Sequence, residues 1–484
     1  MALCITRLGR QQIETAWQKG KEMAMQRAAV VLVSVTVPVA AADPVDLFER
    51  GLRLREQVML WANPGSRYVL VGLGRAAELT DGEPSLERWQ QWLSAGLREG
   101  PVEPGLGPVL FGGFSFDQEK QPTALWQDFP RVSFVLPEFQ FVLRDGDDQG
   151  WLTVNRFISP QDADETGLQW WEKASDWLES ARTGQRGEQV SPEASPATGD
   201  WLTRLKQNGV DVWEDDPETW MHAVRQGAQE IRDGHLKKIV LARRLFLRVS
   251  RDWPTADVLR ALRRQQGNNC YLFAIRRGAG CFLGATPERL VEVAQQEVRV
   301  AALAGSMARG RTPEEDERLG ERLLADRKNR AEHAVVREMI REALAPYCEM
   351  LHIPEEPVLM KLRDIQHLYT PVRGRLKPGR QLLQLVQALH PTPAVGGYPR
   401  EAAMARVRAL EQMDRGWYAG AIGWMDSDGN GEFAVALRSA LFQGREAVLF
   451  AGCGIMGDSD PQTEWEETRV KMTPMLSAIG SVIG

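Results

Sequence analysis

The sequence predicts a large α+β protein with at least one substantial β-sheet. Its 484 residues are 43% hydrophobic and 26% charged, an ordinary balance for a chain that buries a sizeable core. Short apolar runs typical of strands recur along the chain, and in the second half they alternate with amphipathic helical patterns. Many strands with covering helices favour a layered α+β (α/β) fold.

The first half of the chain contains mainly strand patterns. The run AAVVLVSVTVPVAAA, residues 28–42, is rich in Val and too short to cross a bilayer, so we expect a buried strand there. Further strand-like runs cover residues 68–74, 109–117, 131–143 and 151–157. Residues 181–200 contain Ser, Pro, Gly and charged residues but few bulky apolar side chains, which predicts a flexible surface loop.

The second half alternates helices with strands. It opens with an amphipathic helix around residues 217–232, which a strand over 237–249 follows. We expect further helices over residues 254–265, 314–345, 379–389 and 399–412. Strand patterns cover residues 271–277, 281–285, 417–426, 432–442 and 447–455. This order of elements contains no internal repeat.

Charge and cysteine usage limit the function classes. A net charge of -6 gives no general attraction to nucleic acid, which requires a basic surface. An anionic small molecule needs a local cluster of Arg, Lys or metal instead. Five scattered cysteines, with no C-x-x-C pair, fit a reduced compartment better than a disulfide framework or a zinc site. Since the N-terminus lacks the apolar core of a signal sequence, we expect a cytoplasmic protein with no membrane partner.

The C-terminal stretch contains a group of charged residues at helical spacing. Asp460 and Pro461 indicate the start of a helix, in which Glu464, Glu467 and Lys471 fall on one face. Two carboxylates on one face can bind a hard cation such as Mg²⁺, which needs few protein ligands. The alternative is a solvated face with an ordinary Glu467–Lys471 ion pair. Taken alone, the stretch favours the alternative.

A pair of lysines opens the strand pattern at 237–249. Side chains alternate along a strand, so Lys237 and Lys238 must face opposite sides. Lys238 shares its side with Val240 and Ala242, and a lysine on a buried face can act as a base once it is uncharged. A lysine at the sheet edge that reaches solvent is the simpler alternative, and spacing does not exclude it.

Other candidate residues are weak signals one at a time. Glu288 follows a Gly-Ala-Thr-Pro turn at a strand end, where catalytic groups gather, although such a residue is most often a surface or capping group. Glu332 and His333 adjoin apolar positions in a helix, and such a pair is usually structural. The glycines of residues 71–76 lack the third glycine of a dinucleotide fingerprint, which argues against NAD.

Nine motifs in order resemble the chorismate-utilising enzymes. They are LKKIVLARR, GATPERL, ALAGS, RKNRAEH, IQHLYTPVRG, LHPTPAVGGYP, WYAGAIGW, EFAVALRSA and AGCGIMGDSDPQTEWEETRVK. The resemblance covers about residues 215–475. The resemblance implies one intertwined α/β unit in which two large sheets face each other with helices outside. Residues 1–200 are then an N-terminal half woven into the sheets, and residues 215–480 form the chorismate-binding catalytic region.

The resemblance also implies a role for each matched residue. Lys238 corresponds to the general base that activates water, and Glu288 to the general acid that protonates the departing hydroxyl. Glu332 and Glu467 match the Mg²⁺ ligands, with Glu464 as a further ligand that binds directly or through water. The groups that hold the ring carboxylate are matched by Arg438, Lys471 and the backbone at Gly452. The residues around the ring or the nucleophile are matched by Gly305, His367 and Ala394.

Within the family, the residues favour conversion of chorismate to isochorismate. The family's ammonia-using anthranilate enzymes lack a lysine at the position of Lys238, and its aminodeoxychorismate enzymes carry a lysine where this chain has Ala304. Salicylate-forming enzymes are the alternative, against which the TPAVGG segment argues. A catalytically inactive relative is the other alternative, and the presence of the matched residues argues against it. We expect no glutaminase subunit. The long N-terminal half resembles the menaquinone-pathway enzymes more than the shorter siderophore-pathway ones, which are a further alternative.

Overall fold

The computed structural model describes residues 2–54, 57–80, 86–147, 149–162, 167–182, 201–361 and 365–483. Most of the loop expected at 181–200 therefore lies outside the described residues; its first two residues end helix α4 (Gly167–Arg182). Within the described ranges, no helix has the length and apolarity needed to cross a membrane.

Two large β-sheets form the centre of the molecule. Sheet A contains 13 strands in the order β10 (Asp211–Glu214), β11 (Lys238–Arg248), β23 (Glu446–Ile455), β22 (Ser439–Gln443), β13 (Gly280–Thr286), β12 (Tyr271–Arg277), β2 (Val58–Ala62), β3 (Tyr68–Leu73), β8 (Phe139–Arg144), β9 (Gly150–Ile158), β1 (Val31–Val39) and β5 (Leu97–Glu99), with β19 (Gly397–Tyr398) also paired to β11. Strands from the first 200 residues and from the C-terminal half thus share one sheet.

Sheet B contains ten strands and is equally mixed in origin. Its order is β16 (Cys348–His352), β18 (Ile365–Leu376), β15 (Glu297–Ala308), β14 (Arg289–Ala294), β21 (Gly431–Val435), β20 (Ala421–Asp426), β6 (Val109–Phe114), β7 (Val132–Leu136) and β4 (Ala77–Thr80), with β17 (Val358–Lys361) beside β18. Every strand pair in this sheet is antiparallel.

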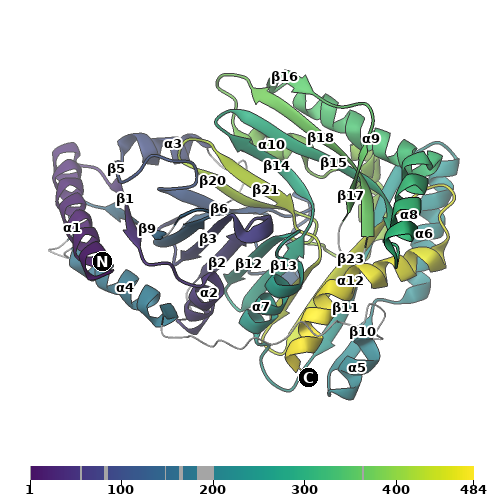
Figure 1. The fold of residues 1–484 in the computed structure, drawn as a ribbon, viewed down its shortest axis with the longest axis horizontal. Coiled ribbons are helices and arrows are strands. Elements are labelled where there is room, and N and C mark those ends of the chain that lie inside the picture. The colour runs from purple at the N-terminus through teal and green to yellow at the C-terminus, as the bar shows by residue number, and fades with distance from the viewer. Residues whose placement is uncertain are drawn as a thin grey trace.

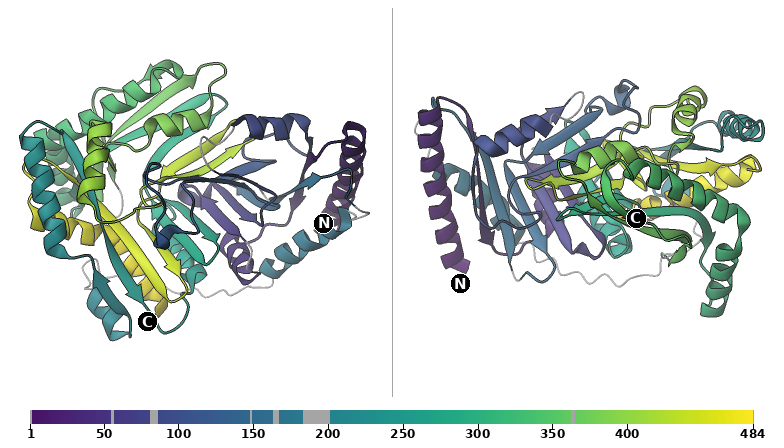
Figure 2. Two further views of the ribbon diagram at one scale, coloured as in Figure 1. Left: turned by 180° about the vertical axis from the view of Figure 1, so that it is seen from behind. Right: turned by 90° about the horizontal axis from the view of Figure 1, so that it is seen from above.

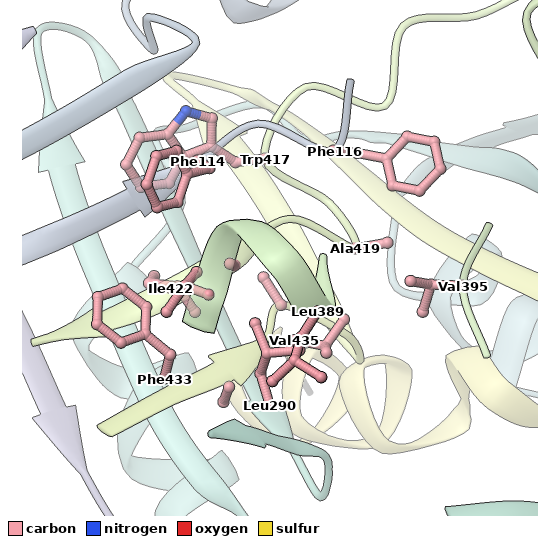
Figure 3. Close-up of a cluster of buried hydrophobic side chains, with 14 of the residues drawn as sticks. Phe114, Phe116, Leu290, Leu389, Val395, Trp417, Ala419, Ile422, Phe433 and Val435 are labelled. Atoms are coloured by element: carbon pink, nitrogen blue, oxygen red, sulfur yellow. The ribbon is translucent and has the colours of Figure 1, made fainter. Parts of the chain in front are cut away.

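The main core lies between the two sheets. Trp61 of β2 in sheet A contacts Phe111 of β6 in sheet B, with ring centroids 6.3 Å apart. Figure 3 shows another part of this core, in which side chains from sheet B lie near Leu389 of helix α10 (Leu382–Leu389). Val395 and Ala419 lie at its edge, where they also line a cavity.

Helices cover the outer sides of the sheets (Figures 1 and 2). A second core lies outside sheet A, beneath α1 (Ala2–Arg27), α2 (Pro44–Arg53), α4, α7 (Thr255–Gln266) and α12 (Pro461–Ile483), with α5 (Trp201–Gln207) and α6 (Pro217–Arg232) beside α12. Helices α8 (Pro313–Ala325), α9 (Arg327–Leu344) and α10 pack on sheet B, α11 (Arg400–Leu410) contacts β11, and α3 (Leu86–Ala95) contacts β1. The α+β fold of two sheets with outer helices is therefore confirmed.

Three predicted elements are each divided in two. The run at 131–143 forms β7 and β8, which separate at Pro137 and enter different sheets. The run at 432–442 likewise divides into β21 of sheet B and β22 of sheet A. The predicted helix at 314–345 breaks at Asp326, where the backbone is extended. The Asp326 side chain caps α9 by accepting a hydrogen bond from the Asn329 N–H. A capping aspartate thus ends one helix and begins the next.

A fourth predicted element is shorter than expected. The strand pattern at 417–426 begins only at Ala421, because Trp417–Gly420 form a turn closed by a Gly420 N–H to Trp417 carbonyl hydrogen bond. The helix at 217–232 and the strand at 237–249 match α6 and β11 to within one residue.

Candidate active site

A cavity of about 350 Å³ is lined by strands of both sheets. Its walls come from β11 and β23 of sheet A, from β15 and β18 of sheet B, from α9 and α12, and from the segment that precedes β19. All eleven residues that the sequence predicted for the site line this cavity: Lys238, Glu288, Gly305, Glu332, His367, Ala394, Arg438, Gly452, Glu464, Glu467 and Lys471. The fold brings them together, while their individual roles stay predictions.

Lys238 is the first residue of β11 and faces the cavity. It is 3% exposed, whereas Lys237 is exposed and its Nζ lies 5.3 Å from the centre of the Tyr398 ring. The Lys238 Nζ donates to Glu332 Oε1 of α9 at 2.5 Å. Gly454 of β23 makes room for the lysine, since a Cβ at that position would lie 2.8 Å from Lys238 Cε. The two lysines therefore face opposite sides of the strand, as their alternation predicts.

Glu288 lies in the turn that joins β13 of sheet A to β14 of sheet B. Its backbone is fixed because its carbonyl accepts a hydrogen bond from the Val435 N–H at 3.0 Å. Burial raises the pKa of Glu288 to about 7, against the opposing effect of nearby cations, of which Lys238 is the strongest. A substantial fraction of Glu288 is thus protonated at neutral pH, the state in which a carboxyl group can donate a proton.

Helix α12 presents its charged face to the cavity. Asp460 caps the helix by accepting from the Thr463 N–H at 2.9 Å. Lys471 Nζ lies 2.5 Å from Glu467 Oε1 and also donates to the Gly452 carbonyl at 3.0 Å. The i,i+4 ion pair that the simpler alternative predicted is therefore present, and it lies on the wall of the cavity, where the Glu467 side chain is 47% exposed.

Three carboxylates of the cavity are candidate ligands for a cation. Glu464 Oε1 accepts from Ser459 Oγ at 2.6 Å, whereas its Oε2 is buried and has no hydrogen-bond partner. Burial, reinforced by Glu467, raises the pKa of Glu464. Burial alone would raise the pKa of Glu332, but Lys238, together with Lys471 and Lys328, holds that pKa below its ordinary value. A partnerless buried oxygen among carboxylates is the environment that a bound cation relieves.

The same carboxylates do not form a closed metal cage. Over the parts of the chain that the structure describes, no three His, Cys, Asp or Glu side chains gather closely enough to hold a metal by themselves. Mg²⁺ usually keeps several waters and takes only one or two protein carboxylates together with substrate oxygens. The residues present therefore fit Mg²⁺ as an open site and do not fit a site built entirely of protein ligands.

Backbone irregularities bring the remaining residues to the cavity. β15 bulges at Gly305, whose φ of 78° suits glycine, and Ser306 beyond it pairs in register with His367 of β18. The Ser306 hydroxyl contacts His367 Nδ1 at 2.7 Å, and burial lowers the pKa of His367 to about 4, so this ring is neutral at pH 7. Arg438 has a φ of 51° where the chain leaves β21 of sheet B for β22 of sheet A.

Several cavity residues were not predicted from the sequence. They are Ser306, Lys328, Asn329, Arg415 and Tyr418. Asn329 Oδ1 accepts from the Ser306 N–H at 3.1 Å and so fixes the bulge beside Gly305. Ser306, Lys328, Asn329 and Tyr418 fall within the quoted motifs ALAGS, RKNRAEH and WYAGAIGW, but spacing within a motif does not show which side chain turns inward. Arg415 lies just before WYAGAIGW, and no sequence signal pointed to it.

The cavity combines a buried lysine, a partly protonated carboxyl group, an arginine and further carboxylates, which suits an enzyme that performs acid–base chemistry on a small anion. Comparison with known proteins gives the family. The chain belongs to the chorismate binding enzymes, which match residues 16–480. Isochorismate synthase MenF of Bacillus subtilis (strain 168) is 35% identical over 99% of this chain and 99% of its own length. The salicylate biosynthesis isochorismate synthase of Pseudomonas aeruginosa is 38% identical over 96% of this chain and 93% of that protein.

Two solved structures share the fold. MenF, the menaquinone-specific isochorismate synthase of Escherichia coli, covers 96% of this chain and 100% of its own with a TM-score of 0.73 at 24% identity. Anthranilate synthase component I of Streptococcus pneumoniae covers 91% and 92% with a TM-score of 0.65, also at 24% identity. At this identity, the two structures establish the architecture alone.

Proposed function

We propose that this chain is an isochorismate synthase, which adds water at C2 of chorismate and releases the C4 hydroxyl. The observation that carries the proposal is that Lys238 and Glu288 enter one cavity from separate strands, with the pKa of Glu288 raised to about 7. The reaction needs a base for the incoming water and an acid for the leaving hydroxyl. One water enters and one leaves, so the product is an isomer of the substrate.

Each proton transfer has a residue to perform it. In its uncharged form, Lys238 takes a proton from the attacking water, and Glu288 gives a proton to the departing oxygen. Such transfers typically contribute about 10²–10⁴-fold each to the rate. Arg438 and Lys471 lie in the same cavity and neutralise the carboxylates of the substrate. The planar guanidinium of an arginine can grip a carboxylate through two hydrogen bonds.

We further propose Mg²⁺ as the cofactor, held by Glu332 and Glu467, with Glu464 direct or through water. The unpartnered Glu464 Oε2 and the shared cavity of the three carboxylates support this assignment. When bound, Mg²⁺ supplies positive charge that neutralises a substrate carboxylate.

Product analysis tests the proposal. Purified protein incubated with chorismate and Mg²⁺ near neutral pH should yield isochorismate, which chromatography distinguishes from chorismate and salicylate. Activity should not depend on ammonium, because Lys238 serves a nucleophile that needs deprotonation. Salicylate with stoichiometric pyruvate would show a salicylate synthase instead. Anthranilate formed only with ammonium would refute the role of Lys238.

Three further proposals concern the pathway that uses the product, the partners of the protein and its cellular compartment. We assign the product to menaquinone synthesis, which the full-length similarity to MenF of Bacillus subtilis supports. The chain should restore menaquinone in a strain that lacks its own isochorismate synthase.

Since water is the nucleophile, no glutaminase subunit is needed. Four buried cysteines carry free thiols, which supports a reducing compartment such as the cytoplasm.

A further inference from the structure

One wall of the cavity is formed by the segment Thr392–Tyr398, which includes Ala394 and Val395. This segment lies against β11, the strand that begins with Lys238. Its last part, β19, pairs with β11 at only two positions, Tyr398 with Lys238 and Gly397 with Ile239. The Val240 N–H then donates to the Gly396 carbonyl at 3.1 Å. Between that point and Leu245, where β10 joins the same edge, no strand of the described residues pairs with β11 on this side.

An ion pair occupies the place of the missing strand. Arg415 Nη2 donates to the Val240 carbonyl at 2.8 Å, and the Ala242 N–H donates to Glu411 Oε1 at 2.7 Å. The two side chains are bound to each other, with Arg415 Nε donating to Glu411 Oε2 at 2.9 Å. Arg415 Nη1 also donates to the Val395 carbonyl at 2.8 Å. One guanidinium thus joins the strand of Lys238 to the wall that contains Ala394.

We propose that Glu411 and Arg415 are a positioning pair for the reaction, which fixes the distance between Lys238 and the Ala394 wall. The inference rests on the proposed function, because it takes Lys238 as the base. The pair is almost fully buried, with the side chains of Arg415 and Glu411 2% and 4% exposed, and Arg415 lies 4.0 Å from the centre of the Phe116 ring. A buried ion pair adds little net stability, because desolvation offsets the attraction, but its geometry is specific.

Close packing transmits this constraint to Lys238. Gly397 has a φ of 126°, and a Cβ there would lie 2.4 Å from the Lys238 carbonyl oxygen. The wall segment therefore lies directly against the backbone of the lysine. Loss of the anchor at Val395 should let the segment move away from β11, which changes the shape of the cavity next to Lys238.

Arg415→Met tests the proposal by removing every donor while keeping an unbranched apolar chain. We expect kcat for isochorismate formation to fall on the order of 10²-fold, as misplaced groups do, with a much smaller change in the KM for chorismate. Arg415→Lys should recover only part of the loss, because an ammonium lacks the planar fork that serves both carbonyls. Glu411→Gln keeps an acceptor for the Ala242 N–H and should show an intermediate loss.

Arg260→Met is the matched control. Arg260 joins α7 to α2 through a 2.7 Å contact with Asp46 Oδ1, outside sheet A and away from the cavity. It should lower thermal stability without lowering kcat at 25 °C. An equal loss of kcat in Arg260→Met, or a folded Arg415→Met with the kcat of the parent chain, would overturn the proposal. If Arg415→Met does not fold, Arg415→Lys and Glu411→Gln decide in the same way.

Hydrogen exchange gives a second result that needs no substrate. The Val240 and Ala242 amides should exchange faster in Arg415→Met than in the parent chain, and at the parent rate in Arg260→Met. Unchanged exchange would refute the anchoring. If the parent chain forms no isochorismate, the proposed function fails, while exchange at these two amides still decides whether Arg415 anchors the wall.

Discussion

Lys237 and Lys238 are neighbours in the sequence, yet the pleat of β11 gives them different environments. Lys238 is buried against Glu332 and Gly454, and Lys237 lies in solvent near Tyr398. The alternation of a strand was enough to predict that only one of them could face a cavity. The resemblance to the chorismate-utilising enzymes indicated that this lysine is Lys238. Spacing alone did not exclude the alternative that Lys238 lies at the sheet edge and reaches solvent.

Substitution of the two lysines should give opposite results. Lys238→Ala should lower turnover by roughly 10²–10⁴-fold, because the attacking water loses its base. Lys237→Ala should leave turnover close to that of the parent chain. Isochorismate formation measured by chromatography, with chorismate binding followed by calorimetry, checks both variants. Loss of activity in Lys237→Ala alone would show that the base is misassigned.

Glu288 should impose a pH limit on the reaction. Its pKa is raised by burial to about 7, so the protonated form that donates to the leaving oxygen is lost as pH rises through 7. We expect kcat/KM to decline on the alkaline side of a pH profile with an apparent pKa near this value. Glu288→Gln should abolish that limb and lower turnover by roughly 10²–10⁴-fold. The same alkaline limb in Glu288→Gln would assign it to another group.

At the scale of elements, α12 shows what a helical pattern can and cannot establish. Spacing predicted that Glu464, Glu467 and Lys471 share a face, and the structure places them on one cavity wall. Spacing could not tell an ordinary ion pair from a metal site, because both use the same i,i+4 geometry. The distinction depends on Glu332 of α9, which is far away in sequence and lines the same cavity.

The dependence of the activity on Mg²⁺ should change when Glu467, on this face of α12, is substituted. Glu467→Gln should weaken the activation of the enzyme by Mg²⁺ while leaving the protein folded, because the residue lies on the cavity rather than in the core. Glu466→Gln is the matched control, since Glu466 is exposed and accepts from Gln462 on the same helix at 2.9 Å. Titration of EDTA-treated protein with Mg²⁺ measures both. Full activity of the metal-free enzyme would exclude the assignment.

Element boundaries were predicted well only where the chain stays in one layer. The strands at 131–143 and 432–442 keep an apolar pattern through the point where they change sheets, so their periodicity gives no sign of the division. Arg438 owes its place in the cavity to one of these changes. Arg415 was missed for a similar reason, because it serves backbone groups of β11 and of the wall segment that only tertiary structure brings together.

At the scale of the whole molecule, the two facing sheets bury polar groups far from solvent. Glu432 of β21 is opposite Glu292 of β14 in the strand register, and the Tyr271 hydroxyl of sheet A donates to Glu432 at 2.7 Å. Burial raises the pKa of Glu432 to about 7. Because its native pKa exceeds its unfolded value, folding binds a proton between these values, and stability falls as pH rises through them.

Glu432→Gln should remove this pH dependence. The amide oxygen still accepts from Tyr271, and no buried charge forms at high pH. The free energy of unfolding from urea denaturation should therefore fall less between pH 5 and pH 8 in the variant than in the parent chain. The variant should be the more stable of the two at pH 8, by on the order of 2–3 kcal/mol. An identical fall in both chains would assign the effect to other groups.

The place of β22 and β23 in sheet A also has a consequence for biosynthesis. These strands come late in the chain, yet they lie between β11 and β13 in the interior of the sheet. While the ribosome is still making residues 439–455, the strands on either side of the gap have unpaired edges, which are prone to aggregate. Folding of the catalytic half must therefore wait for nearly the whole chain. A chain that stops before residue 439 lacks β22 and β23 from the middle of the sheet, and it also lacks α12, which lines the cavity with Glu464, Glu467 and Lys471.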